Sequence, residues 1–293
     1  LTLVDATLRA LPDILRGRVP ATEVMFPESS MRLVEGVYRD NPVADHFNAC
    51  LADALEAAVR ARLQQAPEAR LRILEIGAGT GGTSALLFER LRPYAAQMAE
   101  YAYTDLSKAF LFHAEERFAA GQPYLRCGLL DITRAPAEQG WETGAYDLVV
   151  AANVLHATPD VRRSLRHAKS LLRPGGLLLL NEIARAHLFT HLTFGLLEGW
   201  WLYEDAELRL PGCPALAAEG WKAALRDEGF AAAVLPTGDP QALGQQIVAA
   251  ESDGVLRLPA RPTASDVPSD ALADALADAP TPAARPEIGR AHV

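Results

Sequence analysis

The sequence lacks the features of a protein that binds nucleic acid or spans a membrane. It contains no run of lysine or arginine, and its 28 basic and 37 acidic residues give a formal net charge of −9. This balance argues against nucleic acid or an anionic membrane as the main partner. No apolar run reaches the ~18 residues of a membrane span, and no signal peptide opens the chain. We therefore expect a cytoplasmic protein.

Cysteine is also scarce. Cys50, Cys127 and Cys213 lie far apart, with neither C-x-x-C spacing nor a nearby pair of histidines. This pattern predicts free thiols in a reducing compartment and excludes both a disulfide framework and a metal site. The first residue is Leu1 rather than methionine, which indicates a domain of a longer chain.

The chain divides into three regions by composition. Residues 1–70 show apolar residues at helical spacing and predict an N-terminal helical lid subdomain. Residues 71–258 alternate short apolar segments with amphipathic ones and predict the catalytic core. Residues 259–293 are rich in Ala, Pro, Asp, Ser and Thr, have little to bury, and predict a disordered linker.

The middle region has the rhythm of an α/β fold. The segments "LRILEIG", "EYAYTDLS", "YLRCGLLDI", "YDLVVAANVLH" and "LLLLNEI" predict five strands, with helical patterns between them. Helices between parallel strands predict a doubly wound sheet that binds ligands at the carboxyl ends of its strands. Segments 231–238 and 243–252 predict a final antiparallel hairpin, which gives a Rossmann-like, mostly parallel seven-stranded sheet.

A glycine loop follows the first predicted strand in "ILEIGAGTGGTSALLFERL". Gly77, Gly79 and Gly82 fit G-x-G-x-x-G, whereas Gly77, Gly79 and Gly81 fit G-x-G-x-G. Such a fingerprint is weak alone, because glycine also serves ordinary tight turns. Here a helix follows at once, and Asp105 ends the second strand, where its carboxylate would accept both hydroxyls of a ribose. A dinucleotide and S-adenosylmethionine (SAM) would both offer such a ribose.

Further polar residues at strand ends favour SAM over a dinucleotide. Asp131 ends the third strand, where it would accept an adenine amino group; Asn153 closes the fourth, and Glu75 lies in the first. A lone acidic residue is more often a helix N-cap, a role that we assign to Asp160 but not to Asp105 or Asp131. The predicted cofactor-binding residues are Glu75, Gly77, Gly79, Gly81, Asp105, Leu106, Asp131, Ile132 and Asn153.

Several segments of the sequence resemble those of a known protein family. "ILEIGAGTGGTSALLFERL", "YTDLSKAFLFHAEERF", "YDLVVAANVLHAT" and "LRPGGLLLLNEI" resemble class I methyltransferases, and more narrowly the C-methyltransferase domains of modular polyketide synthases. "FPESSMRLVEGVYRDNPVADHFN", "FTHLTFGLLEGWWLYEDAELRLPGCPAL" and "LGQQIVAAESDGV" are similar to the trans-acyltransferase type, so that the resemblance covers about residues 20–257. It implies SAM as cofactor, a β-ketoacyl substrate on the phosphopantetheine arm of an acyl carrier protein, and neighbouring synthase domains as partners.

Methylation of the carbon between a ketone and a thioester requires a base for its proton. His156 follows the fourth strand and Glu182 closes the fifth. If these strands are neighbours, their ends lie roughly 5 Å apart, close enough for the carboxylate to orient the imidazole. A lone histidine in a loop is usually structural, but the resemblance implies a catalytic pair at these two positions.

An apolar and aromatic insert, about residues 186–220, follows the fifth strand. It is expected to pack as a lid on the N-terminal helices and to wall a tunnel for an acyl chain. Its His187 and His191 are interpreted as pocket or surface residues rather than a second base. The predicted substrate-binding residues are Tyr38, Phe47, Phe194 and Trp200.

These observations predict a SAM-dependent C-methyltransferase that acts on a β-ketoacyl group tethered to an acyl carrier protein. Three alternatives remain open. The first is an O-methyltransferase for a carrier-bound β-hydroxyacyl intermediate, which needs similar machinery. The second is an NAD(P)-dependent oxidoreductase, and the third is a non-catalytic scaffold. The last is disfavoured because it would not need the glycine loop, Asp105, His156 and Glu182 together.

Overall fold

A computed structural model describes residues 2–30, 32–38, 41–234 and 243–257. Residues Leu1–Arg257 form one compact unit. The linker predicted over residues 259–293 lies outside the described residues.

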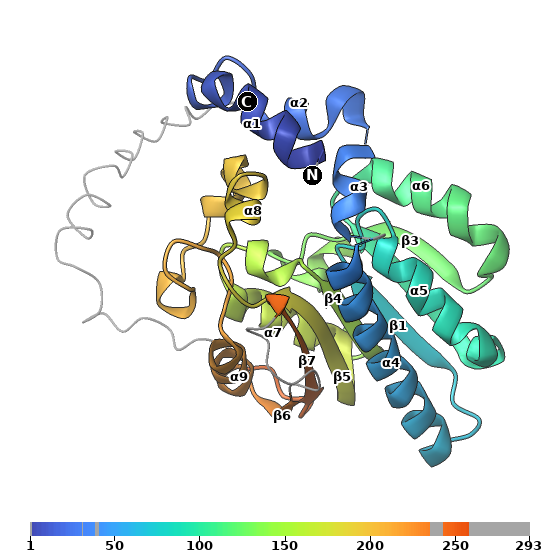
Figure 1. Ribbon diagram of the computed structural model, residues 1–293. Helices are drawn as coiled ribbons and strands as arrows, with labels where there is room; N and C mark the ends of the chain where they lie inside the picture. The colour runs from blue at the N-terminus through green and yellow to red at the C-terminus, as the bar shows by residue number, and fades with distance from the viewer. Residues whose placement is uncertain (1, 31, 39–40, 235–242, 258–293) are drawn as a thin grey trace, which may run out of the picture. The chain divides into compact units, whose positions relative to one another are not determined.

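The centre of this unit is a seven-stranded sheet (Figure 1). Its strands lie in the order β3-β2-β1-β4-β5-β7-β6, with β1 to β5 parallel and β7 antiparallel to both β5 and β6. The predicted doubly wound, mostly parallel sheet with a final antiparallel hairpin is therefore confirmed. The strands are β1 (Leu71–Ile76), β2 (Met98–Asp105), β3 (Leu125–Leu129), β4 (Tyr146–Ala152), β5 (Leu172–Ile183), β6 (Phe230–Val234) and β7 (Gln245–Ser252).

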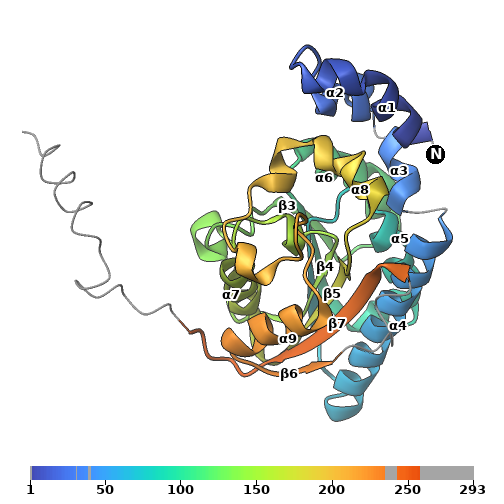
Figure 2. The ribbon, with the colours of Figure 1, turned by 60° about the vertical axis from the view of Figure 1, so that its left-hand side comes forward.

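Helices cover both faces of the sheet because side chains alternate along each buried strand. Ile73 faces α4 (Pro42–Gln65), α5 (Gly82–Leu91) and α6 (Lys108–Phe118) in one core cluster. Its neighbour Leu74 faces α7 (Val161–Leu171) and α9 (Ala218–Asp227) in the other. Figure 2 shows α4 and α7 on opposite sides of the sheet.

The long helix α4, which the predicted N-terminal helical lid subdomain (residues 1–70) includes, packs in the sheet's own layers. It begins at Pro42, with the Asn41 side chain accepting a hydrogen bond from the Val43 amide. Its apolar residues, among them Leu51 and Leu55, are fully buried in the core cluster that contains Ile73. Burial of this face ties the helix to the strands, and Asn48 of the helix also donates to the Tyr38 carbonyl at the end of α3 (Arg32–Tyr38).

The preceding helices pack against the insert that follows β5. These helices are α1 (Thr2–Leu15), α2 (Ala21–Met25) and α3 (Arg32–Tyr38), and the insert contains α8 (Leu188–His191). Leu3, Met25 and Val34 form a cluster with Phe194 and Leu197 of the insert, as expected for a lid. Short 3-10 turns occupy Pro27–Ser29, Arg92–Gln97, Ala119–Gly121, Pro136–Gln139, Leu155–Ala157, Phe194–Leu196, Glu198–Trp201 and Ala206–Leu208.

The cysteines and the cap of α7 are as predicted. The cysteines are free, and Asp160 caps α7 by accepting a hydrogen bond from the Arg163 amide. Within the described part of the chain, no helix is both long and apolar enough to cross a membrane.

A buried lysine fastens the C-terminal strands to α7. The Lys169 ammonium donates to the carbonyls of Glu228, Gly229 and Val255 at 2.6–2.9 Å and lies 2.6 Å from a carboxylate oxygen of Asp253. Lys169 is only 2% exposed. The ammonium holds the pKa of the Asp253 carboxyl below its usual range.

We expect Lys169→Met to lower the free energy of unfolding by about 3–5 kcal/mol, because the Asp253 carboxylate and three carbonyls lose their shared donor. Lys222→Met is the control: Lys222 pairs with the exposed Glu219, and its substitution should change stability by less than about 1 kcal/mol. Urea unfolding measures both values. Equal losses in the two variants would contradict this account of Lys169.

Candidate active site

The glycine loop connects β1 to α5 through backbone conformations that require glycine. Gly77, Gly79 and Gly81 have φ values of +62°, +57° and +73°. A Cβ atom on Gly77 would lie 2.6 Å from the Val154 side chain, and one on Gly81 would lie 2.8 Å from the Phe118 ring. The loop therefore keeps its backbone exposed to a ligand at the carboxyl end of β1.

Asp105 at the end of β2 shapes this loop. Its carboxylate accepts hydrogen bonds from the Gly79 amide at 2.9 Å and from the Ser107 amide at 2.8 Å. The residue is 8% exposed. Burial raises the pKa of the carboxyl, and the two amide donors oppose that shift. The structure thus gives Asp105 an anchoring contact that sequence reasoning did not anticipate, beside its predicted role toward a ribose.

Glu75 lies beneath the loop on the face of β1 that meets α5. One carboxylate oxygen accepts hydrogen bonds from the Ser84 and Tyr101 hydroxyls, each at 2.7 Å. Burial raises the pKa of Glu75 to about 7. Together with Gly77, Gly79 and Asn153, Glu75 lines a cavity of about 180 Å³, which we call the loop cavity.

The other predicted cofactor residues lie at the same edge of the sheet but do not line the loop cavity. Asp131 follows β3, and its carboxylate accepts from the amide and hydroxyl of Thr133 at 2.9 and 2.6 Å. Leu106 is 71% exposed, whereas Ile132 is buried in the core. The contact of Asp131 with an adenine and the part of Leu106 and Ile132 in cofactor binding stay predictions.

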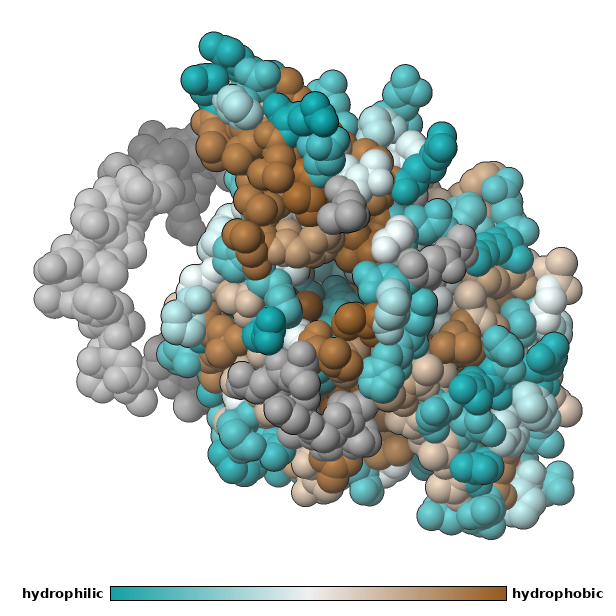
Figure 3. All heavy atoms as spheres, in the orientation of Figure 1, coloured by the Kyte–Doolittle hydropathy of each residue, from teal (hydrophilic) through white to brown (hydrophobic). Residues whose placement is uncertain are grey.

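A larger cavity of about 480 Å³ adjoins the ends of β4 and β5 and is bordered by α3, α4 and the insert. We call it the main cavity. Figure 3 shows the surface hollowed in this region, with hydrophobic residues beside the hollow. Tyr38, Phe194 and Trp200 line it, as their predicted contact with substrate requires, and burial raises the pKa of Tyr38 to about 12. Phe47 does not line it, because its position on α4 faces the sheet and buries the ring in the core.

Asn153 lies between the two cavities and lines both of them, as Tyr38, Thr83 and Phe194 also do. Its backbone has a φ of +56°, an uncommon conformation that asparagine tolerates better than most residues. The Asn153 amide donates to the Asn181 carbonyl at 2.7 Å. Its side-chain oxygen is buried without a partner among the described residues.

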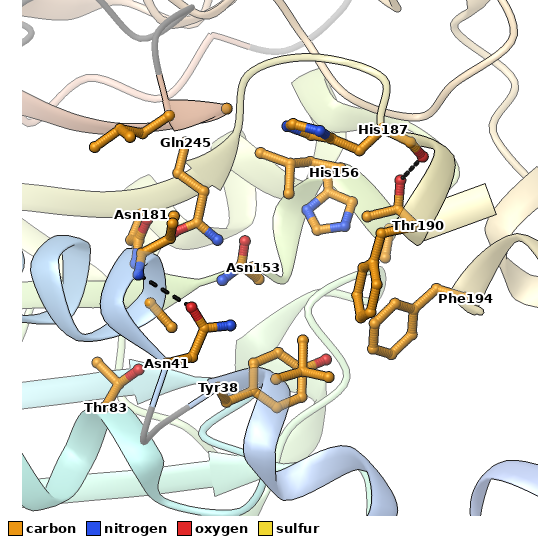
Figure 4. Close-up of a pocket in the computed structure, with 18 of the residues that line it drawn as sticks. Tyr38, Asn41, Thr83, Asn153, His156, Asn181, His187, Thr190, Phe194 and Gln245 are labelled. Atoms are coloured by element: carbon orange, nitrogen blue, oxygen red, sulfur yellow. Dashed lines mark hydrogen bonds between the residues drawn. The ribbon is translucent and has the colours of Figure 1, made fainter. Parts of the chain in front are cut away.

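The structure brings His156 and Glu182 together, as predicted. Nδ1 of His156 lies 2.5 Å from one oxygen of Glu182, and the residues are 5% and 0% exposed. The second Glu182 oxygen accepts from the Leu155 and Val154 amides at 2.8 and 3.2 Å. Figure 4 shows the imidazole facing the main cavity, and its edge meets the Trp200 ring at 5.8 Å between centroids.

Arg209 and Asp205, two residues of the insert, also hold the loop that carries His156. The Arg209 guanidinium donates to the His156 carbonyl at 2.6 Å and to the Thr158 carbonyl at 2.9 Å, and it pairs with Asp205 at 2.5 Å. Asp205 in turn accepts from the Val161 amide at 2.7 Å. Sequence reasoning missed this pair. About 50 residues separate the pair from His156. The spacing of four residues between Asp205 and Arg209, which suits an ion pair, was the one available signal in the sequence.

The two histidines of the insert differ in position. His187 lines the main cavity and accepts a hydrogen bond from the Arg185 side chain at 3.0 Å. Burial and the nearby guanidinium lower the pKa of His187. His191 bonds instead to the carbonyls of His187 and Gly212. No group of three potential metal-ligating side chains occurs within the described ranges.

Comparison with known proteins agrees with this geometry. Residues 74–178 match a family model described as a methyltransferase domain. The chain is 57% identical over 255 residues to polyketide synthase PksM of Bacillus subtilis (strain 168), which covers 87% of this chain and 6% of that synthase. It therefore spans only a small part of the curated relative.

Solved structures show the same similarity. The DszA carbon methyltransferase matches with a TM-score of 0.81 and 39% identity, covering 87% of this chain and 66% of that one. The trans-methyltransferase CalH, in complex with SAH, matches with a TM-score of 0.68 and 34% identity, covering 84% and 66% of the two chains.

The strand order, the glycine loop and Asp105 define a class I methyltransferase that uses SAM. Within this class, the chain belongs to the C-methyltransferase domains of polyketide synthases. The oxidoreductase alternative is thereby excluded.

Asp105→Ala should weaken SAM binding by at least about tenfold, because the ribose loses a charged acceptor and the Gly79 amide loses its anchor. Isothermal titration calorimetry measures the affinity. Asp160→Ala serves as control, since it removes an acidic helix cap that lines neither the loop cavity nor the main cavity and should leave SAM affinity unchanged. Equal affinity of Asp105→Ala and wild type would overturn the assignment of Asp105.

Arg209→Met should cost about 3–5 kcal/mol of unfolding free energy, since it leaves the Asp205 carboxylate buried without its cation. The double variant Arg209→Met/Asp205→Leu should recover part of that loss, because no buried charge remains. Chemical denaturation checks both. A double variant as unstable as the sum of its single variants would contradict the coupling.

Proposed function

We propose that this domain methylates the α-carbon of a β-ketoacyl thioester carried by an acyl carrier protein, with His156 as general base and Glu182 orienting it. The observation that carries the proposal is the buried His156–Glu182 pair in the wall of the main cavity. That cavity meets the loop cavity at Asn153. A proton acceptor is thus available where substrate and cofactor would meet.

The first step would remove a proton from the carbon between the ketone and the thioester. Glu182 accepts the Nδ1–H of His156, which leaves Nε2 as the nitrogen that takes up the proton. The C–H bond breaks, the proton moves to Nε2, and its electron pair passes into an enolate. The Glu182 carboxylate stabilises the resulting imidazolium.

The residues around the loop fit SAM. The positive-φ glycines hold the backbone open, the Asp105 carboxylate lies at the end of β2, and the Asn153 side-chain oxygen awaits a donor. When bound, SAM supplies a methyl group on a sulfonium that the enolate carbon accepts. The insert and α3 border the adjoining cavity and would limit the access of water to that methyl group.

The partners follow from the kind of protein to which the relatives belong. They are large polyketide synthases, of which this chain matches a small part. An acyl carrier protein would deliver the substrate on its phosphopantetheine arm, and further synthase domains would flank this one. The mixture of polar and aromatic side chains in the main cavity supports an acyl thioester as its ligand.

His156→Ala should lower product formation by roughly 10²–10⁴-fold, the usual share of general-base catalysis, with SAM affinity nearly unchanged. Glu182→Gln should cost less, and the double variant should be scarcely worse than His156→Ala, because the two residues act as a unit. His191→Ala is the matched control, since His191 does not line the main cavity.

Two readouts separate the alternatives. Without SAM, wild type should exchange the α-hydrogens of a β-ketoacyl carrier with D₂O faster than His156→Ala. Equal exchange, with methylation still lost, would show that His156 positions substrate instead of removing the proton. Methylation of a β-hydroxyacyl carrier in preference to the β-ketoacyl carrier would establish O-methylation and overturn the proposal.

A further inference from the structure

One side of the main cavity carries carboxamides whose oxygens lack donors. The side-chain oxygens of Asn153, Asn181 and Gln245 are buried and have no hydrogen-bond partner in the described part of the chain. All three residues line the main cavity. A buried acceptor without a donor is costly, so this arrangement calls for a ligand that supplies donors.

The three carboxamide residues lie across the cavity from the aromatic residues. On β5 and β7, Ile183 pairs with Gln245, so that Asn181 and Gln245 point to the same face of the sheet. Figure 4 shows Asn153, Asn181 and Gln245 together on one side and Phe194 on the other. Trp200, which also lines the cavity, has a buried indole N–H with no partner in the residues that the structure describes.

The unpartnered atoms on the two sides are therefore of opposite kind. The carboxamide oxygens accept, whereas the Trp200 indole donates. A β-ketoacyl thioester has only acceptors, its two carbonyl oxygens. The pantetheine arm to which it is attached has amide N–H groups, separated from the thioester sulfur by a short methylene link. The amide N–H groups of the arm can therefore donate to the carboxamide oxygens, and the carbonyl oxygens of the acyl group can accept from the Trp200 indole.

We propose that Asn181 and Gln245 accept hydrogen bonds from the amide N–H groups of the pantetheine arm. The arm then runs along the carboxamide side and the acyl chain along the aromatic side, beside His156. This assignment rests on the proposed function. Asn153 is left out of it, because the residue also lines the loop cavity, where the cofactor is proposed to bind.

The test compares thioesters with and without an amide. Wild type, Asn181→Leu and Gln245→Leu are assayed for methylation of a β-ketoacyl N-acetylcysteamine thioester and of the matching S-alkyl thioester, in which methylenes replace the amide. Each substitution should lower kcat/KM for the amide substrate by about threefold to tenfold, the effect of one neutral hydrogen bond. Each should change kcat/KM for the S-alkyl substrate by less than twofold.

Gln246→Leu is the matched control. Gln246 is the next residue on β7, and its side-chain oxygen is also buried without a partner among the described residues, but it does not line the main cavity. Its loss should affect both thioesters equally. Melting temperature gives a second readout: Asn181→Leu should leave the free domain at least as stable as wild type, since it removes a buried unsatisfied oxygen.

The outcomes distinguish the two proposals. Equal losses on both thioesters, or none on either, with wild type active on both, would overturn the assignment of Asn181 and Gln245 alone. Wild type inactive on both thioesters and on the β-ketoacyl carrier protein would overturn the proposed function and this assignment with it. A loss confined to the amide substrate, absent in Gln246→Leu, would support it.

Discussion

The site depends on the hydrogen bonds that the Glu182 carboxylate accepts. This carboxylate is fully buried, and it is shared between His156 and the amides of Val154 and Leu155. A carboxylate in such a place is tolerated because each oxygen has donors. The same three hydrogen bonds determine the path of the chain after β4. The position of the imidazole, the bend at Asn153 and the wall of the main cavity all follow from that path.

The loop that Glu182 holds from the sheet is held from the insert by Arg209. The His156 carbonyl accepts from Arg209 while its imidazole contacts Glu182, so that one residue is fastened at both backbone and side chain. The insert is thus more than a cover over the cavity. Disorder in it would release the Arg209–Asp205 pair and with it the geometry of the base. The Arg209 contacts therefore link the insert to the placement of the base.

The predictable features were those that local pattern and strand alternation determine. The glycine loop, Asp105 and the His156–Glu182 pair follow from strand ends that a parallel sheet brings to one edge. Phe47 was misplaced because helical spacing shows that a face is apolar but not which surface covers it. The Arg209 contacts join segments about 50 residues apart within an irregular insert, where no periodicity indicates contact.

Asn153 combines an uncommon backbone conformation with a position between the two cavities. Its positive φ would suit glycine best, yet glycine would remove the Asn153 side chain from a boundary that Tyr38, Thr83 and Phe194 also line. Asparagine tolerates the conformation and adds an amide that lines both cavities. Its backbone amide binds the Asn181 carbonyl, so the strained turn is anchored to the strand that also carries Glu182. The conformational cost at Asn153 is therefore offset by β5, the strand that also orients the base.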